Sequence, residues 1–209
     1  MHILIIIIGL IIGAILNSVI ALISSDINKG KRQTTITLNQ SFYNKGKVLI
    51  PVICCLAFEI IFLRFGFTIM LVKAIVMFIL LLIISVIDFR YRIIPNFMVA
   101  ITLAIGIIFS LLVRASFFDI ILGMLAGGGI LFLLALVPNA MGGGDIKLMF
   151  AIGAFLGFNR TLWALLVAFI LCSLLSIALI LTKIKGTKDY IPFGPFLSVG
   201  SFISLLFFI

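Results

Sequence analysis

Charged residues are scarce in this chain of 209 residues, of which only 10% are Asp, Glu, Lys or Arg. Hydrophobic residues make up 65% of the chain, and its mean hydropathy is +1.48. A soluble domain of this length could not bury so much apolar surface. The composition therefore excludes a soluble domain and predicts an all-α, polytopic membrane protein.

Cysteine and histidine are also rare, which bears on metal binding. The three cysteines, Cys54, Cys55 and Cys172, lie in apolar runs and form no CxxC pattern, so we expect small buried apolar residues. The single histidine, His2, is expected to be an exposed terminal residue. No cluster of His, Cys and Glu resembles a metal site, and we predict none.

Eight apolar runs follow one another along the chain. They lie near 3–23, 50–64, 67–87, 97–113, 118–137, 146–158, 161–182 and 191–208. If the N-terminus is outside, the cytosolic segments are 24–49, 88–96, 138–147 and 183–190. These segments hold eleven Lys and Arg residues, whereas the external turns hold three.

This asymmetry predicts a bundle of about eight transmembrane helices with both termini outside. We expect one transmembrane domain over residues 1–209, with 24–49 as a short basic cytosolic loop. The net charge of +9 then reflects topology and indicates no nucleic-acid partner.

Small residues recur at the GxxxG spacing in three of these runs: Gly9/Gly13, Gly123/Gly127 and Gly153/Gly157. Such pairs let helix backbones approach closely, so we expect them at tight helix contacts. The run 146–158 would extend only about 20 Å as a helix, against a hydrocarbon core of about 30 Å. Either this helix starts below the membrane surface, or it continues across Asn159 and Arg160.

Two charged residues, Glu59 and Lys73, lie inside predicted spans, where an unpaired charge is costly. Each is seven positions from Gly66, the centre of the turn between the spans, so an antiparallel hairpin places them at matching depth. We predict a structural ion pair; a proton relay is the alternative.

Two aspartates sit at the cytosolic ends of predicted spans. Asp88 ends an apolar run, and Asp145 begins one in the segment MGGGDIK. Two nearby carboxylates that share a proton can activate a water and protonate a leaving amine, although each could also be an ordinary acid at a helix end. Helix dipoles predict that Asp145 is ionised and Asp88 carries the proton.

Among the other charged residues, Lys147 is expected to face lipid headgroups or another loop. Asp26, Asp119 and Asp189 are expected to be solvated.

These residues resemble those of the type IV prepilin peptidase family. Gly142 to Asp145 fits the GxGD motif of intramembrane aspartyl proteases, and Lys147 extends it to GxGDxK. Asp88 followed by Ile94, Pro95 and Asn96 is similar to the family's first aspartate and its downstream element. The segments GLIIGAILNSVI, LRFG, GAFLGF and IPFGPFL resemble further parts of the family, in order along the chain.

The resemblance implies a membrane-embedded aspartic endopeptidase of the bacterial plasma membrane. It would remove the basic leader of prepilins or pseudopilins at the cytosolic face, with Asp88 and Asp145 as the catalytic pair and no cofactor. Gly142 and Gly144 would let the substrate backbone approach. Longer family members carry a cysteine-rich zinc loop and use S-adenosylmethionine to methylate the new N-terminus. Residues 24–47 contain no cysteine, so we expect no zinc and leave methylation open.

Two other functions fit the residues. A small transporter could use Asp88, Asp145 and Glu59 as a proton or cation path, although both aspartates lie at one face and no inverted repeat is visible. A non-enzymatic assembly component could bind pilin helices through its GxxxG faces.

Overall fold

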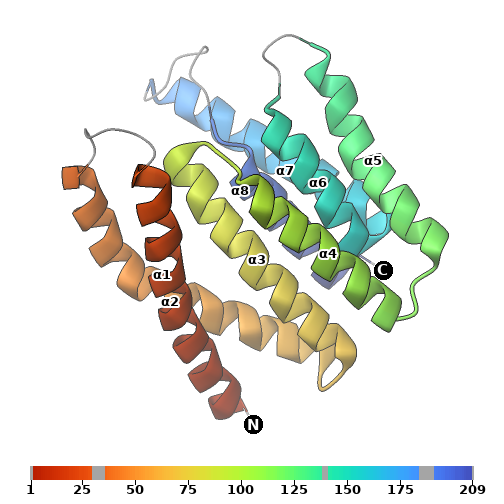
Figure 1. Ribbon diagram of the computed structural model, residues 1–209, viewed down its shortest axis with the longest axis horizontal. Helices are drawn as coiled ribbons and strands as arrows, with labels where there is room; N and C mark the ends of the chain where they lie inside the picture. Colours follow the sequence, from red (N-terminus) through yellow and green to blue (C-terminus); the bar gives the residue numbers. More distant parts are fainter. Residues whose placement is uncertain (1, 30–35, 138–140, 184–190, 209) are drawn as a thin grey trace. The chain divides into compact units, whose positions relative to one another are not determined.

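The structure is a computed structural model that describes residues 2–29, 36–137, 141–183 and 191–208; for 3–4, 24–29 and 36–48 it describes the backbone alone. Over these ranges the chain forms eight α-helices and no strand, which confirms the all-α prediction (Figure 1). The helices are α1 (His2–Lys29), α2 (Ile36–Phe65), α3 (Ile69–Tyr91), α4 (Asn96–Leu112), α5 (Phe117–Ala135), α6 (Gly143–Leu156), α7 (Phe158–Leu181) and α8 (Gly194–Phe207).

The helices belong to two compact units, Met1–Ile75 and Val76–Ile209, which are described separately below. Unit 1 contains α1, α2 and the start of α3, and unit 2 contains the rest of α3 and α4 to α8. The single domain over residues 1–209 stays a prediction.

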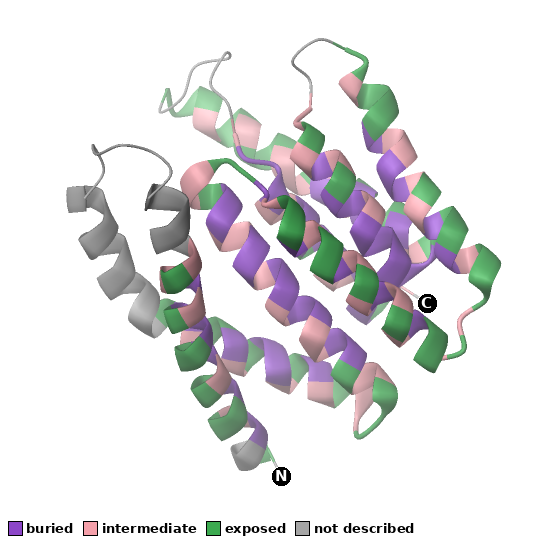
Figure 2. Cartoon of the chain, in the orientation of Figure 1, coloured by how far each residue is buried: buried purple, intermediate pink, exposed green. Residues whose placement is uncertain are grey.

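In the part of the chain that the structure describes, four helical segments are long and apolar enough to cross a membrane: Ile5–Ile23, α3, α5 and α7. Helices α4 and α8 are shorter but also apolar. Many residues of these helices are exposed (Figure 2). The exposed large apolar side chains include Phe118 and Leu181. Such surfaces suit a lipid environment, and together with the spans they confirm a polytopic membrane protein. The placement of both termini outside stays a prediction.

The segment 24–49 differs from the predicted loop. Helix α1 continues to Lys29 and α2 already begins at Ile36. A helix satisfies its backbone hydrogen bonds internally, so it can pass from an apolar into a polar sequence without a break. Residues 24–29 and 36–49 are therefore helical, and the cytosolic location of this segment stays a prediction. Residues 30–35, and the side chains of Asp26 and Asp189, lie outside what the structure describes.

Unit 1 is built on a close contact between α1 and α2. A Cβ atom on Gly13 would lie 2.5 Å from Cα of Pro51, and one on Gly9 would lie 2.9 Å from Cα of Cys55. Any larger side chain at these two positions would push the helices apart. The predicted close packing at this GxxxG pair is confirmed.

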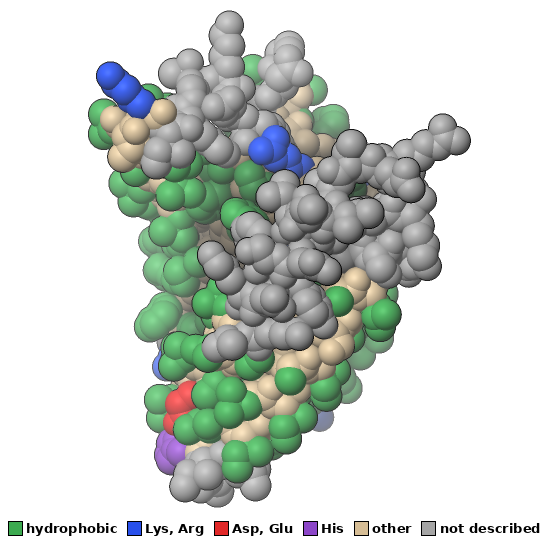
Figure 3. Space-filling view, turned by 90° about the vertical axis from the view of Figure 1, so that its left-hand side faces the viewer, with side chains coloured by type: hydrophobic (Ala, Val, Ile, Leu, Met, Phe, Trp, Pro, Cys, Tyr) green, Lys and Arg blue, Asp and Glu red, His purple; other side chains and the backbone are tan. Residues whose placement is uncertain are grey.

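Glu59 of α2 contacts the ring nitrogen Nδ1 of His2 through Oε1, and its other carboxylate oxygen is buried without a hydrogen-bond partner. Figure 3 shows the chain's only histidine, in purple, beside an acidic side chain in red. His2 is exposed, as expected, but it is held by this contact. Lys73 is buried. The Glu59–Lys73 ion pair stays a prediction.

Helix α6 is the centre of unit 2, where it contacts α4, α5, α7 and α8 (Figures 1 and 2). It ends at Leu156, because Gly157 turns the chain with a φ of 76° and α7 begins at Phe158. Continuation across Asn159 is therefore wrong. A helix of 14 residues spans only about 21 Å. Because neighbouring helices surround α6, its ends do not need to reach the membrane surfaces.

The contact between α5 and α6 depends on glycine. A Cβ atom on Gly123 would lie 2.5 Å from the carbonyl oxygen of Gly153, and one on Gly127 would lie 2.6 Å from that of Met149. The two GxxxG pairs of unit 2 thus lie in one interface, as predicted. Asp119 of α5 also accepts the backbone N–H of Phe158 at 2.9 Å, so it caps α7 and is more than a solvated charge.

Candidate active site

Asp88 lies near the end of α3, one turn before Tyr91, and is only 5% exposed. Its Oδ2 atom accepts a hydrogen bond of 3.0 Å from the backbone N–H of Gly194, the first residue of α8. Ser198 holds α8 against α3 through a 3.3 Å hydrogen bond to the carbonyl oxygen of Leu81. The N-terminus of α8 thus directs its positive dipole at Asp88.

Asp145 lies in the first turn of α6 and is 4% exposed. Gly142 caps this helix with extended backbone, and the N–H of Asp145 donates to the carbonyl oxygen of Gly142 at 3.1 Å. The prediction that Asp145 begins a short helix is confirmed. The carboxyl group is held in a buried position on the helix that α4, α5, α7 and α8 contact.

The two carboxyl groups are close enough to influence each other. Burial, and then the negative charge of Asp88, raise the pKa of Asp145 to about 7, while a backbone hydrogen bond from Gly142 opposes the rise. A carboxyl group with a pKa in this range can take up and release a proton near neutral pH, as a shared-proton dyad requires.

Tertiary contacts also influence which carboxyl group of this pair carries the proton. The N–H of Gly194 stabilises the ionised form of Asp88, and the raised pKa of Asp145 favours a proton there. Both interactions depend on tertiary contacts that the dipole argument omitted. They favour Asp88 as the carboxylate and Asp145 as the acid.

The glycines before Asp145 do not adopt positive φ angles, and their missing side chains matter instead for packing and for space. In the described part of the chain, positive φ among glycines occurs at Gly66 and Gly157, not in the segment 142–144. A Cβ atom on Gly144 would lie 3.2 Å from Cβ of Ile94, whereas one on Gly143 would meet nothing within 4 Å. Gly144 therefore packs against the segment that follows Asp88, and Gly143 leaves open space beside the pair.

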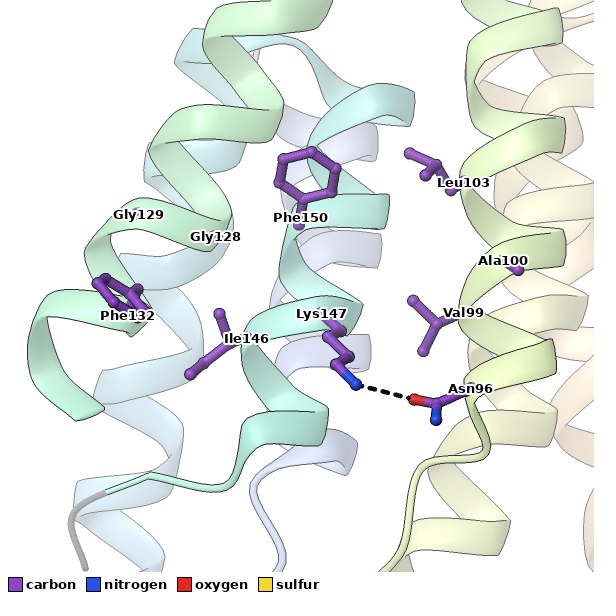
Figure 4. Close-up of a pocket in the computed structure, with 10 residues that line it drawn as sticks. All are labelled: Asn96, Val99, Ala100, Leu103, Gly128, Gly129, Phe132, Ile146, Lys147 and Phe150. Carbon is purple, nitrogen blue, oxygen red and sulfur yellow. Dashed lines mark hydrogen bonds between the residues drawn. The ribbon is translucent and has the colours of Figure 1, made fainter. Parts of the chain in front are cut away.

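Lys147 of the GxGDxK segment contacts the element Ile94-Pro95-Asn96 that follows Asp88. Its Nζ donates a 3.1 Å hydrogen bond to Oδ1 of Asn96, the first residue of α4 (Figure 4). Pro95 precedes Asn96 in extended conformation at the N-cap. Lys147 thus reaches the start of a neighbouring helix. A contact with lipid headgroups stays a prediction. The structure brings Asp88 close to Asp145 and Lys147 to Asn96, and it packs Gly144 on Ile94.

One functional contact escaped the sequence reasoning, namely the N–H of Gly194. The local signals for this contact were Pro195, because proline is common in the first turn of a helix, and the family-like segment IPFGPFL around Gly194. Among the residues that the structure describes, no group of three His, Cys, Asp or Glu side chains could hold a metal ion. Cys54, Cys55 and Cys172 are free thiols; Cys54 is buried and the other two are half-buried.

Comparison with known proteins tests the family assignment. A family model described as the type IV leader peptidase family matches residues 75–177, which include both aspartates. The prepilin leader peptidase/N-methyltransferase of Escherichia coli (strain K12) is 31% identical over 164 residues, which is 75% of this chain and 72% of that protein. The chain belongs to the type IV leader peptidase family. The predicted family is therefore confirmed.

Other members of the family are longer than the matched region. The Bacillus subtilis (strain 168) protein of the same name is 32% identical over 69% of this chain and 59% of its own length. The Aeromonas hydrophila protein is 35% identical over 48% of this chain and 37% of its own length. The chain thus spans about two fifths to three fifths of these two relatives. No solved structure matches it.

Proposed function

We propose that this chain is an aspartic endopeptidase that removes the leader of type IV prepilins or pseudopilins. The observation that supports it best is the coupled, buried pair Asp88 and Asp145, with the N–H of Gly194 on Asp88. Membership of the leader peptidase family and the names of the relatives agree with this chemistry.

The pair supports a simple hydrolytic cycle. Ionised Asp88 takes a proton from a water, whose oxygen attacks the scissile carbonyl carbon, while protonated Asp145 gives its proton to the carbonyl oxygen. When the C–N bond breaks, the leaving amine takes the proton from Asp88. Asp145 recovers its proton from the hydroxyl of the diol as the new carboxyl group forms, and the resting pair returns.

The substrate in this proposal is a precursor with a basic leader followed by an apolar helix that lies in the bilayer. Its scissile bond then lies near the membrane surface, at the end of unit 2 that carries Asp88 and Asp145. The asymmetry of Lys and Arg between the segments supports a cytosolic position for this end, in a bacterial plasma membrane.

Proteolysis by this pair requires no metal or cofactor, and the proposal includes no zinc, since residues 24–49 contain no cysteine. The relatives' names also include N-methyltransferase. N-methylation by this chain would require S-adenosylmethionine as the methyl donor. Mass spectrometry of a processed product decides this point, because methylation adds 14 Da to the new N-terminus.

The decisive experiment replaces each aspartate by asparagine and follows precursor processing in cells. Asp88→Asn and Asp145→Asn should each abolish cleavage almost completely, because the two groups act as a unit. Asp119→Asn is the matched control: it removes a carboxylate from unit 2 but keeps an oxygen that can accept the N–H of Phe158. Normal processing by either active-site variant, at normal protein levels, would refute the proposal.

The two alternative functions have less support. A proton or cation path needs acidic groups distributed along the membrane depth, whereas Asp88 and Asp145 form one electrostatically coupled pair. A purely structural assembly component gives no reason to bury two carboxyl groups together, because that burial costs free energy. The same two substitutions distinguish these functions, since only the peptidase predicts accumulation of uncleaved precursor.

A further inference from the structure

An open apolar groove lies on the surface of α6, between α4 and α5 (Figure 4). Its volume is about 750 Å³. Val99 and Leu103 of α4 line one wall, Gly129 and Phe132 of α5 line the other, and Phe150 of α6 lies between them. The groove exists because α4 and α5 both pack on α6 but hardly touch each other.

The polar part of this groove is confined to one end. There Lys147 donates its hydrogen bond to Asn96, while Phe150 and Leu103 lie further along the groove (Figure 4). Lys147 belongs to the first turns of α6, as does Asp145, so the polar end is the end that carries the candidate active site. The groove therefore leads from the active-site end along the bundle.

The wall formed by α5 is open at Gly129. A Cβ atom there would meet nothing within 4 Å, whereas one on the adjacent Gly128 would lie 3.0 Å from the ring of Phe150. Gly128 thus serves packing inside the protein, but Gly129 does not. An occupant of the groove can approach the backbone of α5 at this point.

We propose that this groove binds the apolar helix that follows the scissile bond in the precursor, with an acidic side chain in its first turns paired to Lys147. The proposal rests on the proposed peptidase function. A helix of that kind has apolar side chains to match the walls. Its N-terminal end would lie at Lys147, and the residues before it would pass over Gly143, where there is open space, toward the aspartates.

Charge explains why the occupant needs an acid. Within the described residues Lys147 is hydrogen-bonded to a neutral amide, with no carboxylate within 4.0 Å. The N-terminus of an incoming helix carries a partial positive charge, and a basic leader adds more, so both would repel Lys147. A carboxylate in the first turns of the occupant removes this repulsion and supplies the missing counter-charge.

Filling the groove tests the proposal. Gly129→Leu adds a side chain to the groove at a position where its Cβ atom meets nothing within 4 Å. Leu134→Trp, which adds bulk to an exposed position elsewhere on α5, is the matched control. Each purified variant receives two substrates: a precursor with a basic leader and about 20 apolar residues, and a short peptide that covers the scissile bond but lacks the helix.

We expect Gly129→Leu to lower kcat/KM for the helical precursor by at least about tenfold, and to leave cleavage of the short peptide unchanged. The control should cleave both substrates like the wild type. A precursor whose first-turn Glu is replaced by Gln should raise KM for the wild type. Cleavage of the helical precursor by Gly129→Leu at the wild-type rate would overturn the proposal.

A binding measurement separates this proposal from the proposed function. A photo-reactive phenylalanine analogue at position 132, in the Asp145→Asn background, should cross-link to the apolar helix of the precursor. Cross-links to lipid alone would overturn the groove proposal even if the wild type is an active peptidase. Cross-links to the helix together with a wild type that cleaves neither substrate would support the groove and refute the peptidase.

Discussion

The backbone N–H of Gly194 donates a 3.0 Å hydrogen bond to Oδ2 of Asp88, 106 residues earlier in the chain. A Cβ atom on Gly194 would lie 2.6 Å from that same oxygen, so only glycine brings the start of α8 this close to the carboxylate. Gly194 is therefore a positioning residue for Asp88, through both its N–H and its missing side chain.

Gly194→Ala should displace Asp88 and lower kcat by about a hundredfold, because small misplacements of a catalytic group have effects of this size. The expected change is in kcat and in the pH profile of activity, with little change in KM. Kinetics with a purified precursor measure all three. Val199→Ala, at an exposed position of α8, is the control and should behave like the wild type. An unchanged pH profile would limit Gly194 to a role in folding.

The pKa of Asp145 predicts how stability depends on pH. Its folded-state pKa of about 7 lies above the ordinary value of 3.8, so the folded protein holds this proton more tightly than the unfolded chain. Protonation of Asp145 therefore contributes its full stabilisation of the folded state below about pH 4, and this stabilisation is lost as the pH rises to about 7. Asp145→Asn removes this dependence, so its Tm relative to the wild type should rise from pH 5 to pH 8, by at least about 2 °C.

Thermal unfolding in detergent at several pH values checks this expectation. Asp88→Asn offers a second comparison, because it removes the neighbouring charge that contributes to the high pKa of Asp145. The dependence on pH should then be weaker than in the wild type. A Tm difference between Asp145→Asn and the wild type that stays constant with pH would contradict the buried, coupled state of Asp145.

Packing of α5 on α6 provides a prediction about stability. A Cβ atom on Gly153 would lie 2.2 Å from the carbonyl oxygen of Gly123, which is backbone and cannot rotate away. Gly153→Ala should therefore destabilise unit 2 by about 1–3 kcal/mol. Gly129→Ala, on the open wall of the groove, should be neutral or stabilising by up to about 1 kcal/mol. Equal unfolding midpoints for the two variants would show that the close approach is absent.

The contact between Asn96 and Lys147 gives a prediction about substrate binding. Asn96→Asp replaces the neutral partner by a carboxylate, which would then compete with an acidic substrate group for Lys147. We expect KM for a helical precursor to rise about fivefold, equivalent to about 1 kcal/mol for an exposed ion pair, with kcat retained. Asn96→Ser is the control, since it keeps a neutral hydroxyl at the same position. Steady-state kinetics that show equal KM values for the two variants would argue against a binding role for this end of the groove.

The sequence alone predicted the membrane class, one close helix contact and the start of α6, because each depends on neighbouring residues. Hydropathy predicted the membrane class, and the spacing of Gly123, Gly127 and Gly153 predicted a close helix contact that the structure contains. The segment MGGGDIK predicted a helix that begins at Asp145. Each of these inferences depends on a few neighbouring residues, whose chemistry is the same in any fold.

The tertiary structure decided what depends on residues far apart in the chain. It placed the N–H of Gly194 on Asp88, a contact that opposes the proton preference predicted from the dipoles of α3 and α6 alone. It directed Lys147 to Asn96 and opened a groove beside Gly129. Sequence spacing could not specify these contacts, because they require α3, α4, α6 and α8 to meet at one end of unit 2, and that meeting is set by the packing of whole helices.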